Sequence, residues 1–455
     1  MKVHFIAIGG SAMHNLAIAL HTKGYTVTGS DDEFFEPSKS RLASLGLLPA
    51  SEGWDETRIH AGLDAVILGM HAKPDNPELL KATRLGIRVF SYPEYLYEQS
   101  KGKTRVVIGG SHGKTTITAM ILHVLHDTGI DCDYMVGAQL DGFDVMVRLT
   151  DKSRFMILEG DEYLTSPVDR RPKFHLYMPD IALLSGIAWD HINVFPTFEN
   201  YVDQFKQFIR LISPGGSLIW CEDDETLASN CPAARTDIHI QSYALPAHRV
   251  DKGITLLRYQ DQEFPLQVFG KHNLLNLNGA RLVCNALGVD DEKFYSSIVG
   301  FRGASKRLER VADGEFTSVF KDFAHSPSKL MATLNAVKEQ YPGRKLVACM
   351  ELHTYSSLSK EFLGHYKGCM DAADVAIVYF SPHAIQLKKL PSITPEEVKA
   401  GFSNDRLEIF TDPALLKERL LKENWHGKNL LMMSSGNFDG ISVEGIAEDI
   451  LTYDH

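Results

Sequence analysis

The sequence of 455 residues predicts an α/β protein of three domains, each built on a largely parallel sheet. Short apolar runs of strand type alternate with helical stretches along the whole chain, and polar or glycine-containing segments follow most of these runs. Because a domain takes roughly 150 residues, the length leaves room for about three. We place the domains at residues 1–103, 104–300 and 301–455.

The first domain begins with a strand, a glycine turn and a helix. "VHFIAI" from Val3 and "AVILGM" from Ala65 predict buried strands, "YTVTGSDD" predicts a strand that ends in acidic residues, and "SAMHNLAIALHTKG" predicts a helix. The turn departs from the dinucleotide fingerprint GxGxxG, because Ser11 and His14 stand where glycines are needed. This counts against an NAD(P)-dependent oxidoreductase, a reading that a nicotinamide-binding assay would decide.

The second domain opens with "VVIGGSHGKTTITAMILHVL" from Val106, which predicts a strand, a phosphate-binding turn and a helix. The glycine before Gly113 falls one or two positions too close for the common GxxxxGK[ST] loop. The parts still suit a nucleotide, with backbone N–H groups at a helix N-terminus, Lys114 for the β and γ phosphates, and a hydroxyl for Mg²⁺. The predicted loop consists of Gly110, Ser111, His112, Gly113, Lys114, Thr115 and Thr116.

Acidic residues and a histidine follow three further strands of this domain, "FMILEGDE", "IALLSGIAWDH" and "GSLIWCEDDE". Ligands of open α/β sheets bind outside such strand ends. Glu159, Asp161 and Glu162, with His191 after Asp190, are therefore candidates to hold Mg²⁺. Without the phosphate loop nearby, "EGDE" would be read as a solvated acidic turn.

The third domain alternates in the same way through "TSVFKDFAH", "RKLVACMEL", "ADVAIVYFSP" and "NLLMMSSGNFDG". A net charge of −11 argues against a nucleic-acid or anionic-membrane partner, because those surfaces are bound mainly through clustered Lys and Arg. No apolar run approaches the ~18 residues of a membrane span. The six cysteines show no zinc spacing, so we expect reduced thiols in a cytoplasmic protein.

Five segments, in order, resemble motifs of the Mur ligases, the ATP-dependent amide ligases of bacterial peptidoglycan synthesis. "GSHGKTT" resembles their phosphate loop, "EGDE" with "WDH" their Mg²⁺ sites, and "GKHNLLN" the segment that contacts adenine. "FRGASKRLE" resembles the entry to their last domain, and "KDFAHSP" a following DDYAHHP segment. The resemblance covers nearly the whole chain.

The resemblance implies an N-terminal Rossmann-like domain that binds UDP, a central P-loop-type ATPase domain with a parallel sheet, and a C-terminal Rossmann-like domain that completes the ATP and amine sites. It implies a reaction between the lactyl carboxylate of UDP-N-acetylmuramate and an amine, with ATP and two Mg²⁺ ions as cofactors. Lys114 would stabilise the transferring phosphoryl group, Thr115 and Glu159 would hold one Mg²⁺, and His191 with Glu159 the second. Adenine would contact His272, Asn273 and Asn276. Arg307 and Asp322 would reach the phosphates and ribose once the domains close. His325 is a further catalytic residue that the resemblance implies.

For the sugar nucleotide, the resemblance implies that "GGSAM" receives the diphosphate at a helix N-terminus. The implied residues of this pocket are Gly9, Gly10, Ser11, Ala12, Met13, Asp31, His71 and Asn76. For His14, packing within a helix or exposure at the surface is favoured over a catalytic role.

Within the family, "EGDEYLTSPVDRRPKFHLY" looks most like the recycling members, which attach the tripeptide L-Ala-γ-D-Glu-meso-diaminopimelate. The alternative is the L-alanine-adding subfamily of peptidoglycan synthesis. "ELHTYSSLSKEF" matches neither subfamily's pattern. Gly160 stands where the family usually has alanine, and we expect either residue to be tolerated there. Lys321 and Ser326 stand where the family often has an aspartate and a histidine. Amine-binding residues are therefore not assigned.

Two further alternatives stay open at this stage. A nucleotide-dependent switch would hydrolyse ATP without any muramate compound, whereas a ligase needs both carboxylate and amine. Lys206 stands about where some sister ligases carry a carbamylated lysine, but a solvated lysine on the helix "FENYVDQFKQFIRLI" is the favoured reading. The sequence does not indicate an oligomeric state.

Overall fold

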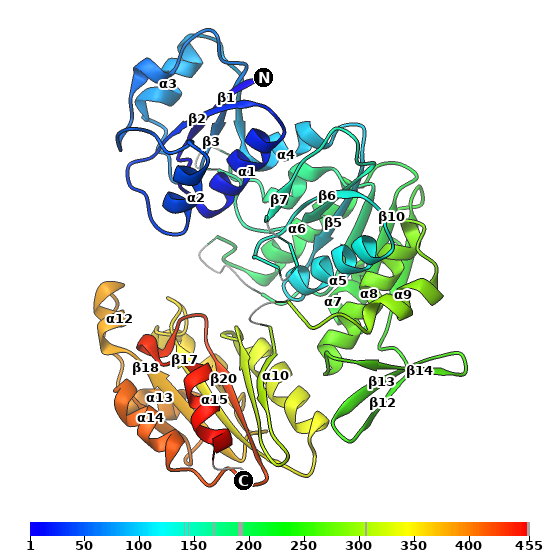
Figure 1. Ribbon diagram of the computed structural model, residues 1–455, viewed down its shortest axis with the longest axis vertical. Coiled ribbons are helices and arrows are strands. Elements are labelled where there is room, and N and C mark those ends of the chain that lie inside the picture. The colour runs from blue at the N-terminus through cyan, green and yellow to red at the C-terminus, as the bar shows by residue number, and fades with distance from the viewer. Residues whose placement is uncertain (141, 144, 167–168, 190–193, 305–306, 453–455) are drawn as a thin grey trace. The chain divides into compact units, whose positions relative to one another are not determined.

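The computed structural model describes residues 1–455 except 141, 144, 167–168, 190–193, 305–306 and 453–455. The described chain forms four sheets, three of them predominantly parallel and flanked by helices (Figure 1). Consecutive parallel strands need a crossover, which helices supply here as the alternating sequence pattern predicted.

The first sheet has the strand order β2-β1-β3-β4 and is parallel throughout. Val3, Phe5 and Ile6 of β1 are fully buried, because β1 lies inside this sheet. Its strands are β1 (Lys2–Ile6), β2 (Thr26–Ser30), β3 (Ala65–Leu68) and β4 (Val89–Ser91). Its helices are α1 (Ser11–Thr22), α2 (Ser38–Ser44), α3 (Pro77–Arg84) and α4 (Tyr92–Ser100), with a 3₁₀ turn at Glu56–Arg58.

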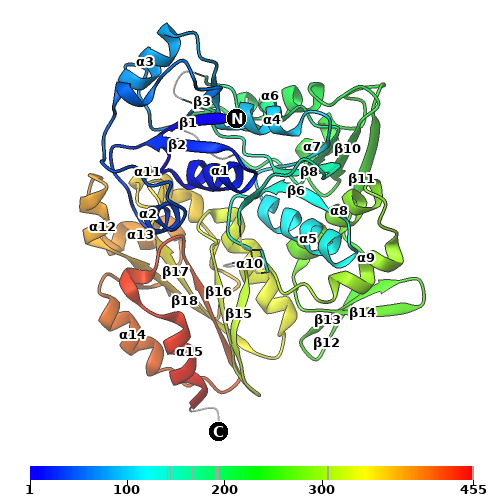
Figure 2. The same cartoon turned by 45° about the horizontal axis from the view of Figure 1, so that its top comes forward.

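The second sheet has seven strands in the order β11-β10-β9-β5-β8-β6-β7, with the phosphate-loop strand β5 in the middle. The register pairs Ile108 with Glu159 and Gly109 with Leu184, so the ends of β5, β8 and β9 lie together. Helix α5 packs against β5 and β8 (Figure 2). The strands are β5 (Thr104–Gly109), β6 (Cys132–Met135), β7 (Val147–Arg148), β8 (Phe155–Glu159), β9 (Ile181–Leu184), β10 (Ser217–Cys221) and β11 (His239–Tyr243). The helices are α5 (Lys114–Asp127), α6 (Phe198–Arg210), α7 (Glu225–Asn230), α8 (Lys271–Ala286) and α9 (Asp291–Ile298), with a 3₁₀ turn at Lys173–Tyr177.

A small antiparallel sheet that the sequence pattern did not reveal consists of β12 (His248–Asp251), β13 (Ile254–Tyr259) and β14 (Gln262–Leu266). Its strands are short and mostly half-exposed, so they lack the strong apolar runs of the parallel strands.

The last sheet has the order β15-β16-β20-β17-β18-β19 and is parallel except for the pair β15 and β16. Leu346, Ala348 and Met350 of β17 face one core, while Val347 and Cys349 face the other, as the period of two in a strand requires. The strands are β15 (Glu309–Asp313), β16 (Ser318–Asp322), β17 (Lys345–Leu352), β18 (Val375–Phe380), β19 (Glu408–Phe410) and β20 (Lys428–Met433). The helices are α10 (Pro327–Gln340), α11 (Lys360–Leu363), α12 (Pro382–Leu387), α13 (Pro395–Phe402), α14 (Pro413–Leu421) and α15 (Val443–Thr452), with 3₁₀ turns at Gly364–Tyr366 and Phe438–Gly440.

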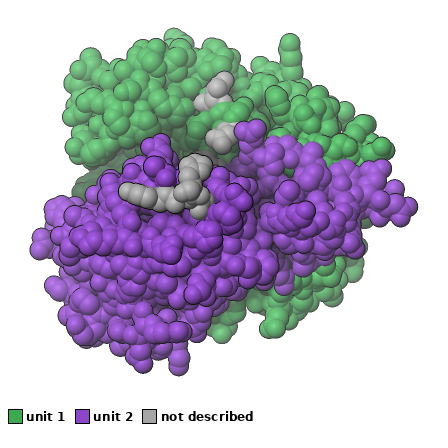
Figure 3. Space-filling model, turned by 60° about the horizontal axis from the view of Figure 1, so that its bottom comes forward, with its two compact units in different colours: residues 1–244, 275–298 green, residues 245–274, 299–455 purple. Residues whose placement is uncertain are grey.

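The chain forms two compact units, coloured separately in Figure 3. Unit 1 comprises residues 1–244 and 275–298 and contains the first two sheets; unit 2 comprises residues 245–274 and 299–455 and contains the other two. Residues 245–274, which the sequence placed with the central domain, group with unit 2 because Phe269 packs in its core and Thr255 donates to Gln340 of α10 (3.0 Å). Our three boundaries therefore remain a proposal.

All six cysteines are buried and unbridged. In the part of the chain that the structure describes, no helix combines the length and hydropathy that crossing a membrane requires.

Candidate active site

The phosphate loop joins the end of β5 to the start of α5 in unit 1. Gly110 and Gly113 have φ values of 127° and 77°, which L side chains rarely adopt. A Cβ at Gly110 would lie 2.2 Å from Ser185 Oγ, and one at Gly113 would lie 2.3 Å from Asn276 Oδ1. No side chain caps the first N–H groups of α5, so they remain available to an anion.

Lys114 lies within this loop and is held by two oxygen acceptors. Its Nζ donates to Gly110 O (2.6 Å) and to Glu162 Oε2 (2.7 Å). Burial acts to lower the pKa of Lys114, but the carboxylates of Glu162, Asp161 and Glu159 outweigh it and hold that pKa above its ordinary value. The ammonium group is therefore fully charged at neutral pH and positioned beside the loop.

Thr115 and Glu159 form the second contact of the loop. Thr115 Oγ1 donates to Glu159 Oε1 (2.8 Å), and Gly137 N–H donates to Glu159 Oε2 (2.8 Å). A hydroxyl and a carboxylate are hard oxygen ligands of the kind that Mg²⁺ takes from a protein when phosphates and water complete its shell. These residues therefore fit a magnesium ion, although among the described residues no group of three or more His, Cys, Asp or Glu side chains is placed to hold a metal.

The three acids at the carboxyl end of β8 have separate partners, so the segment is not a solvated acidic turn. Asp161 accepts from Lys173 Nζ (2.5 Å), and Glu162, which is 1% exposed, also accepts from the Tyr201 hydroxyl (3.1 Å). Burial raises the pKa of Asp161, but Lys173 and Lys114 outweigh it and bring that pKa below its ordinary value. Glu159 alone of the three contacts Thr115.

The remaining loop residues are fixed by their neighbours. Ser111 Oγ is 2.9 Å from the Tyr201 hydroxyl and accepts from Ala188 N–H (2.9 Å), while Ser111 N–H donates to Gly186 O (2.9 Å). His112 Nδ1 lies 2.8 Å from Ser111 O, and Thr116 is buried. Sequence reasoning did not find Tyr201 and Ser185, because they lie far along the chain and belong to no local motif. His191 and Asp190 lie outside the described residues.

A cavity of about 850 Å³ lies in unit 1 at the start of α1. Of the residues predicted for a sugar nucleotide, those that line it are Gly9, Gly10, Ser11, Asp31 and His71. The first turn of α1 has no side-chain cap, so its N–H groups can receive an anion. Ala12 is exposed on this turn and Met13 is buried beneath it.

The cavity wall includes a histidine whose hydrogen bonds fix its tautomer. His14 Nδ1 is 3.0 Å from Gly10 O, which can only accept, and Arg41 Nη1 donates to His14 Nε2 (3.2 Å). Burial lowers the pKa of His14, and the nearby Arg41 lowers it further, against the bond to Gly10. His14 is thus a neutral packing histidine, as expected, but it also lines the cavity, together with Asn15 and Arg41, which sequence reasoning missed.

Asp31 ends β2 at the same cavity. Its carboxylate accepts from Gly9 N–H (2.7 Å) and Asp32 N–H (3.0 Å), so it positions the glycine turn. Burial raises the pKa of Asp31 to about 6, with Asp32 adding to the shift and the two backbone N–H groups opposing it.

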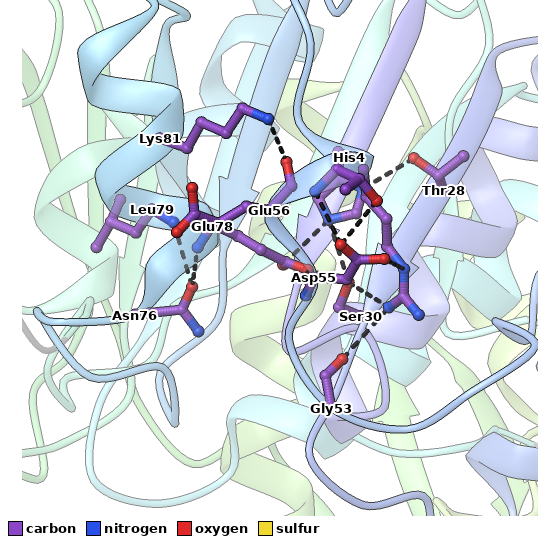
Figure 4. A network of polar contacts seen from close by, with 12 residues as sticks. His4, Thr28, Ser30, Gly53, Asp55, Glu56, Asn76, Glu78, Leu79 and Lys81 are labelled. Carbon is purple, nitrogen blue, oxygen red and sulfur yellow. Dashed lines mark hydrogen bonds and ion pairs between the residues drawn. The ribbon is translucent and has the colours of Figure 1, made fainter.

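Asn76 is placed differently from the other residues predicted for this pocket. Its side chain caps α3, accepting from Glu78 N–H (2.9 Å) and Leu79 N–H (3.2 Å). It borders the buried network of Figure 4, in which Glu78 is 3.3 Å from His4 Nε2 and accepts from Ser30 Oγ (2.6 Å). Of the described residues, those lining the cavity do not include Asn76, so its present role is to hold a helix.

The three residues predicted to contact adenine lie in the first turns of α8, which begins in unit 2 and continues in unit 1. Asn276 belongs to unit 1 and reaches Gly113 of the phosphate loop. His272 and Asn273 belong to unit 2, where Asn273 Nδ2 donates to Phe269 O (2.9 Å). Burial lowers the pKa of His272 to about 4, so this ring is neutral at pH 7.

Arg307, Asp322 and His325 are neighbours in unit 2. Asp322 accepts from Leu308 N–H and Ala324 N–H (both 2.6 Å), and the Arg307 guanidinium lies over the Phe323 ring (5.0 Å). Burial raises the pKa of Asp322 to about 6, against the opposing effect of Arg307. His325 Nδ1 is 2.9 Å from Phe323 O.

Three further positions clarify departures from the family pattern. Lys321 pairs with Glu309 (3.2 Å) and Glu444 (2.7 Å), so it serves as a surface ion pair. Lys206 is exposed on α6. A Cβ at Gly160 would lie 2.9 Å from Val107 Cγ1 and 3.0 Å from Ile108 O. Our expectation that glycine and alanine are interchangeable at position 160 is therefore not supported, because the glycine packs against buried β5.

Comparison with known families decides the relationship. Three family models match in order: the Mur ligase family catalytic domain at residues 2–104, the Mur ligase middle domain at 108–284, and the Mur ligase glutamate ligase domain at 306–436. The chain is a Mur ligase. Members of this family are ATP-dependent amide ligases, so the predicted family, three-domain α/β fold and enzyme class are confirmed.

Individual relatives of this Mur ligase include both subfamilies considered above. A UDP-N-acetylmuramate–L-alanine ligase of Renibacterium salmoninarum is 30% identical over 449 residues, covering 96% of this chain and 93% of the relative. The crystal structure of a murein peptide ligase from Psychrobacter arcticus matches with a TM-score of 0.61, 23% identity and coverage of 99% and 98%. That of a UDP-N-acetylmuramate–alanine ligase from Thermotoga maritima matches with a TM-score of 0.69, 19% identity and the same coverage. The two structures establish the shared fold.

Proposed function

We propose that this Mur ligase joins the lactyl carboxylate of UDP-N-acetylmuramate to an amine, at the expense of ATP. The observation that carries the proposal is the arrangement in unit 1, where Lys114 and the Thr115–Glu159 pair border an uncapped helix N-terminus. The same unit contains a second uncapped helix N-terminus that opens on a cavity of about 850 Å³. Two anion sites suit one nucleoside triphosphate and one sugar diphosphate.

The proposed chemistry follows from the poor leaving ability of a carboxylate oxygen. The carboxylate attacks the γ-phosphorus of ATP to give an acyl phosphate and ADP, and the amine then displaces phosphate from the acyl carbon. Lys114 exchanges Glu162 for the phosphoryl oxygens and stabilises their charge during transfer. Thr115 and Glu159, with His191, would hold Mg²⁺, which would neutralise charge between the two anions.

The remaining residues predicted for the site have the following roles in this proposal. Asn276, with His272 and Asn273, would contact adenine, and Arg307, Asp322 and His325 would complete the nucleotide and amine sites from unit 2. Gly9, Gly10 and Ser11 would receive the diphosphate, with Asp31 and His71 beside it. A cytoplasmic location, where ATP and UDP-sugars are supplied, is part of the same proposal.

We infer that the amine is the tripeptide L-Ala-γ-D-Glu-meso-diaminopimelate. The stretch "EGDEYLTSPVDRRPKFHLY" supports this inference. The second candidate is L-alanine, which the name of the Renibacterium salmoninarum relative favours. Both reactions use the same sugar nucleotide and differ only in the amine.

An amine competition tests the proposal. The enzyme is given UDP-N-acetylmuramate and Mg-ATP with equal concentrations of tripeptide and L-alanine, and the products are separated by mass. We expect the tripeptide product to form at least tenfold faster. Preferential formation of the L-alanine product would move the enzyme to the second candidate, and ATP hydrolysis without either product would overturn the ligase activity itself.

A further inference from the structure

A buried polar network lies in the N-terminal sheet of unit 1, next in sequence to the cavity at the start of α1 (Figure 4). Its centre is Glu78, whose side chain is 0% exposed, as is that of His4. Glu78 Oε1 accepts from the Ser30 hydroxyl (2.6 Å) and from Asp55 N–H (2.8 Å). Its Oε2 lies 3.3 Å from His4 Nε2, and Arg58 Nη1 donates to the same Ser30 hydroxyl (2.8 Å). We call the side chains of His4, Ser30, Arg58 and Glu78 the Glu78 network.

Glu78 carries a charge at a place that solvent does not reach. Burial acts to raise its pKa, but the hydrogen bonds from His4, Ser30 and the Asp55 N–H outweigh this effect and bring that pKa below its ordinary value. The carboxylate is therefore ionised at neutral pH. A buried, paired charge adds little net stability compared with apolar residues of similar size. The network is therefore better explained by the arrangement that it fixes than by the stability that it adds.

The network joins four elements of the N-terminal sheet and its surroundings. His4 belongs to β1, Ser30 to β2, Arg58 to the 3₁₀ turn and Glu78 to the first turn of α3. The loop before α3 contains His71, which lines the cavity. Elements that meet at one buried carboxylate cannot shift independently, because a shift would leave a buried polar group unpaired.

Ser30 links this network to the glycine turn of the cavity. Its hydroxyl donates to Glu78, while its carbonyl accepts from Ala7 N–H (2.9 Å) and Ile8 N–H (3.0 Å). Ala7 has a φ of 69°, a left-handed conformation that a residue other than glycine keeps only where its surroundings enforce it. The two bonds to the Ser30 carbonyl supply that constraint. The turn then continues into Gly9, which lines the cavity.

A second route connects the network to the cavity wall. Asp31, the residue after Ser30, lines the cavity and accepts from Gly9 N–H (2.7 Å). Gly53 N–H donates to the Asp31 carbonyl (2.7 Å), and Arg58 Nη1 donates to the Gly53 carbonyl (3.3 Å). The network therefore reaches both sides of the glycine turn.

We propose that the Glu78 network positions the glycine turn for the diphosphate of the sugar nucleotide. This rests on the proposed function, in which the turn at Gly9 receives that diphosphate. A helix N-terminus holds an anion through N–H groups that point at it, so a displaced turn would bind the anion less tightly. Among the described residues, those lining the cavity include no member of the network. Its members are therefore positioning residues, and they act on binding and not on phosphoryl transfer.

Calorimetric titration of the whole enzyme with UDP-N-acetylmuramate, without ATP, tests this inference. Ser30→Ala removes the hydroxyl that joins β2 to Glu78 and keeps the carbonyl that accepts from the turn. We expect the Kd for UDP-N-acetylmuramate to rise about tenfold. In steady-state assays its KM should rise by the same factor, while kcat and the KM for ATP stay within about twofold, because the lost interaction affects the ground state and the transition state alike.

A pair of identical substitutions separates positioning from general destabilisation. Glu78→Gln keeps the shape of the side chain but loses its charge and one of two acceptor oxygens, so the Kd should rise about fivefold. Glu56→Gln is the matched control, because Glu56 also joins the 3₁₀ turn to α3, through Arg84 (3.0 Å). The side chains of Glu56 and Arg84 are 48% and 66% exposed, so this variant should bind within about twofold of the unsubstituted enzyme. Melting curves check that each variant is folded at the temperature of the titration.

An unchanged Kd in Ser30→Ala and Glu78→Gln, or an equal rise in Glu56→Gln, would overturn the inference. A loss that falls on kcat or on the KM for ATP would overturn it as well. If the unsubstituted enzyme binds UDP-N-acetylmuramate but forms no amide, the proposed ligation fails, while the titrations still decide the role of the network. If it does not bind UDP-N-acetylmuramate at all, the sugar-nucleotide site and this inference fail together.

Discussion

The phosphate loop of unit 1 and the buried Glu351 near the end of β17 in unit 2 both lie at the carboxyl ends of parallel strands, yet the carboxylates at these two places have different sets of partners. Glu162 pairs with Lys114 and accepts from Tyr201, whereas one oxygen of Glu351 has no hydrogen bond among the described residues. The first site is satisfied internally, and under the proposed function a nucleotide would replace those partners. In the second, Glu351 Oε2 accepts from the Ser434 hydroxyl and from Phe438 N–H (2.8 Å), while Oε1 lies 3.4 Å from His353 Nδ1 without a hydrogen bond.

The largest expected effect comes from removing the cation of the satisfied site. Lys114→Ala should lower kcat by about 10³-fold, because the transferring phosphoryl loses its stabilising charge. Coupled ADP release with UDP-N-acetylmuramate and tripeptide measures this effect. The substitution also leaves Glu162 buried without its cation, which costs about 3–5 kcal/mol, so melting curves must accompany the assay. Lys206→Ala is the control, since that lysine is exposed on α6; a comparable loss there would indicate a modified, metal-binding lysine instead.

A smaller loss of activity should distinguish the acids at the carboxyl end of β8. Glu159→Gln should reduce kcat about 10²-fold and raise the Mg²⁺ concentration needed for half-maximal rate, because Glu159 is the acid that contacts Thr115. Asp161→Asn is the comparison, since Asp161 pairs with Lys173. Magnesium titrations of both variants give the answer, and equal shifts would contradict the separate roles assigned to them.

The packing behind the phosphate loop gives the next prediction. Gly160→Ala should lower the free energy of unfolding by about 1–3 kcal/mol, because the new Cβ would press on Val107 and the Ile108 carbonyl. Urea denaturation measures the change. Gly343→Ala is matched to it, since a Cβ at Gly343 meets nothing within 4 Å and its φ lies outside the left-handed region. A neutral Gly160→Ala would restore the expectation that alanine fits.

The smallest effect concerns pH. The pKa of Asp31 is raised from 3.8 to about 6, so between these values the folded state binds more protons than the unfolded state. Stability contributed at this site is therefore present below about pH 4 and is lost as the pH rises through about 6, by about 1 kcal/mol once screening by solvent is allowed for. Asp31→Asn should flatten this part of the pH dependence in urea midpoints. An unchanged slope would mean that Asp31 ionises normally.

Much of the fold and of the nucleotide site could be predicted because both depend on local pattern. Each predicted parallel strand is present in the structure, for example those that contain Val106 and Leu346. Such strands can be predicted because a strand buried on both faces has a nearly continuous run of apolar residues. The antiparallel strands at 248–266 were not predicted, because their half-exposed residues lack that signal.

The parts of the sites that escaped prediction depend on distant contacts. Tyr201 reaches Ser111 across 90 positions, and Ser434 reaches Glu351 across 83. Asn76 was predicted for a ligand pocket from its place in a motif, but its amide oxygen caps α3 instead. Register and side-chain direction decide such partnerships, and neither can be read from spacing alone.

The six buried thiols give each unit its own chemical reporter. Cys132, Cys221, Cys231 and Cys284 belong to unit 1, while Cys349 and Cys369 belong to unit 2. Burial raises the pKa of Cys231 to about 12 and that of Cys369 to about 11, so alkylation of the native protein must await local opening. Pulsed alkylation followed by peptide mapping would thus reveal which half of the enzyme opens first, without introducing any label.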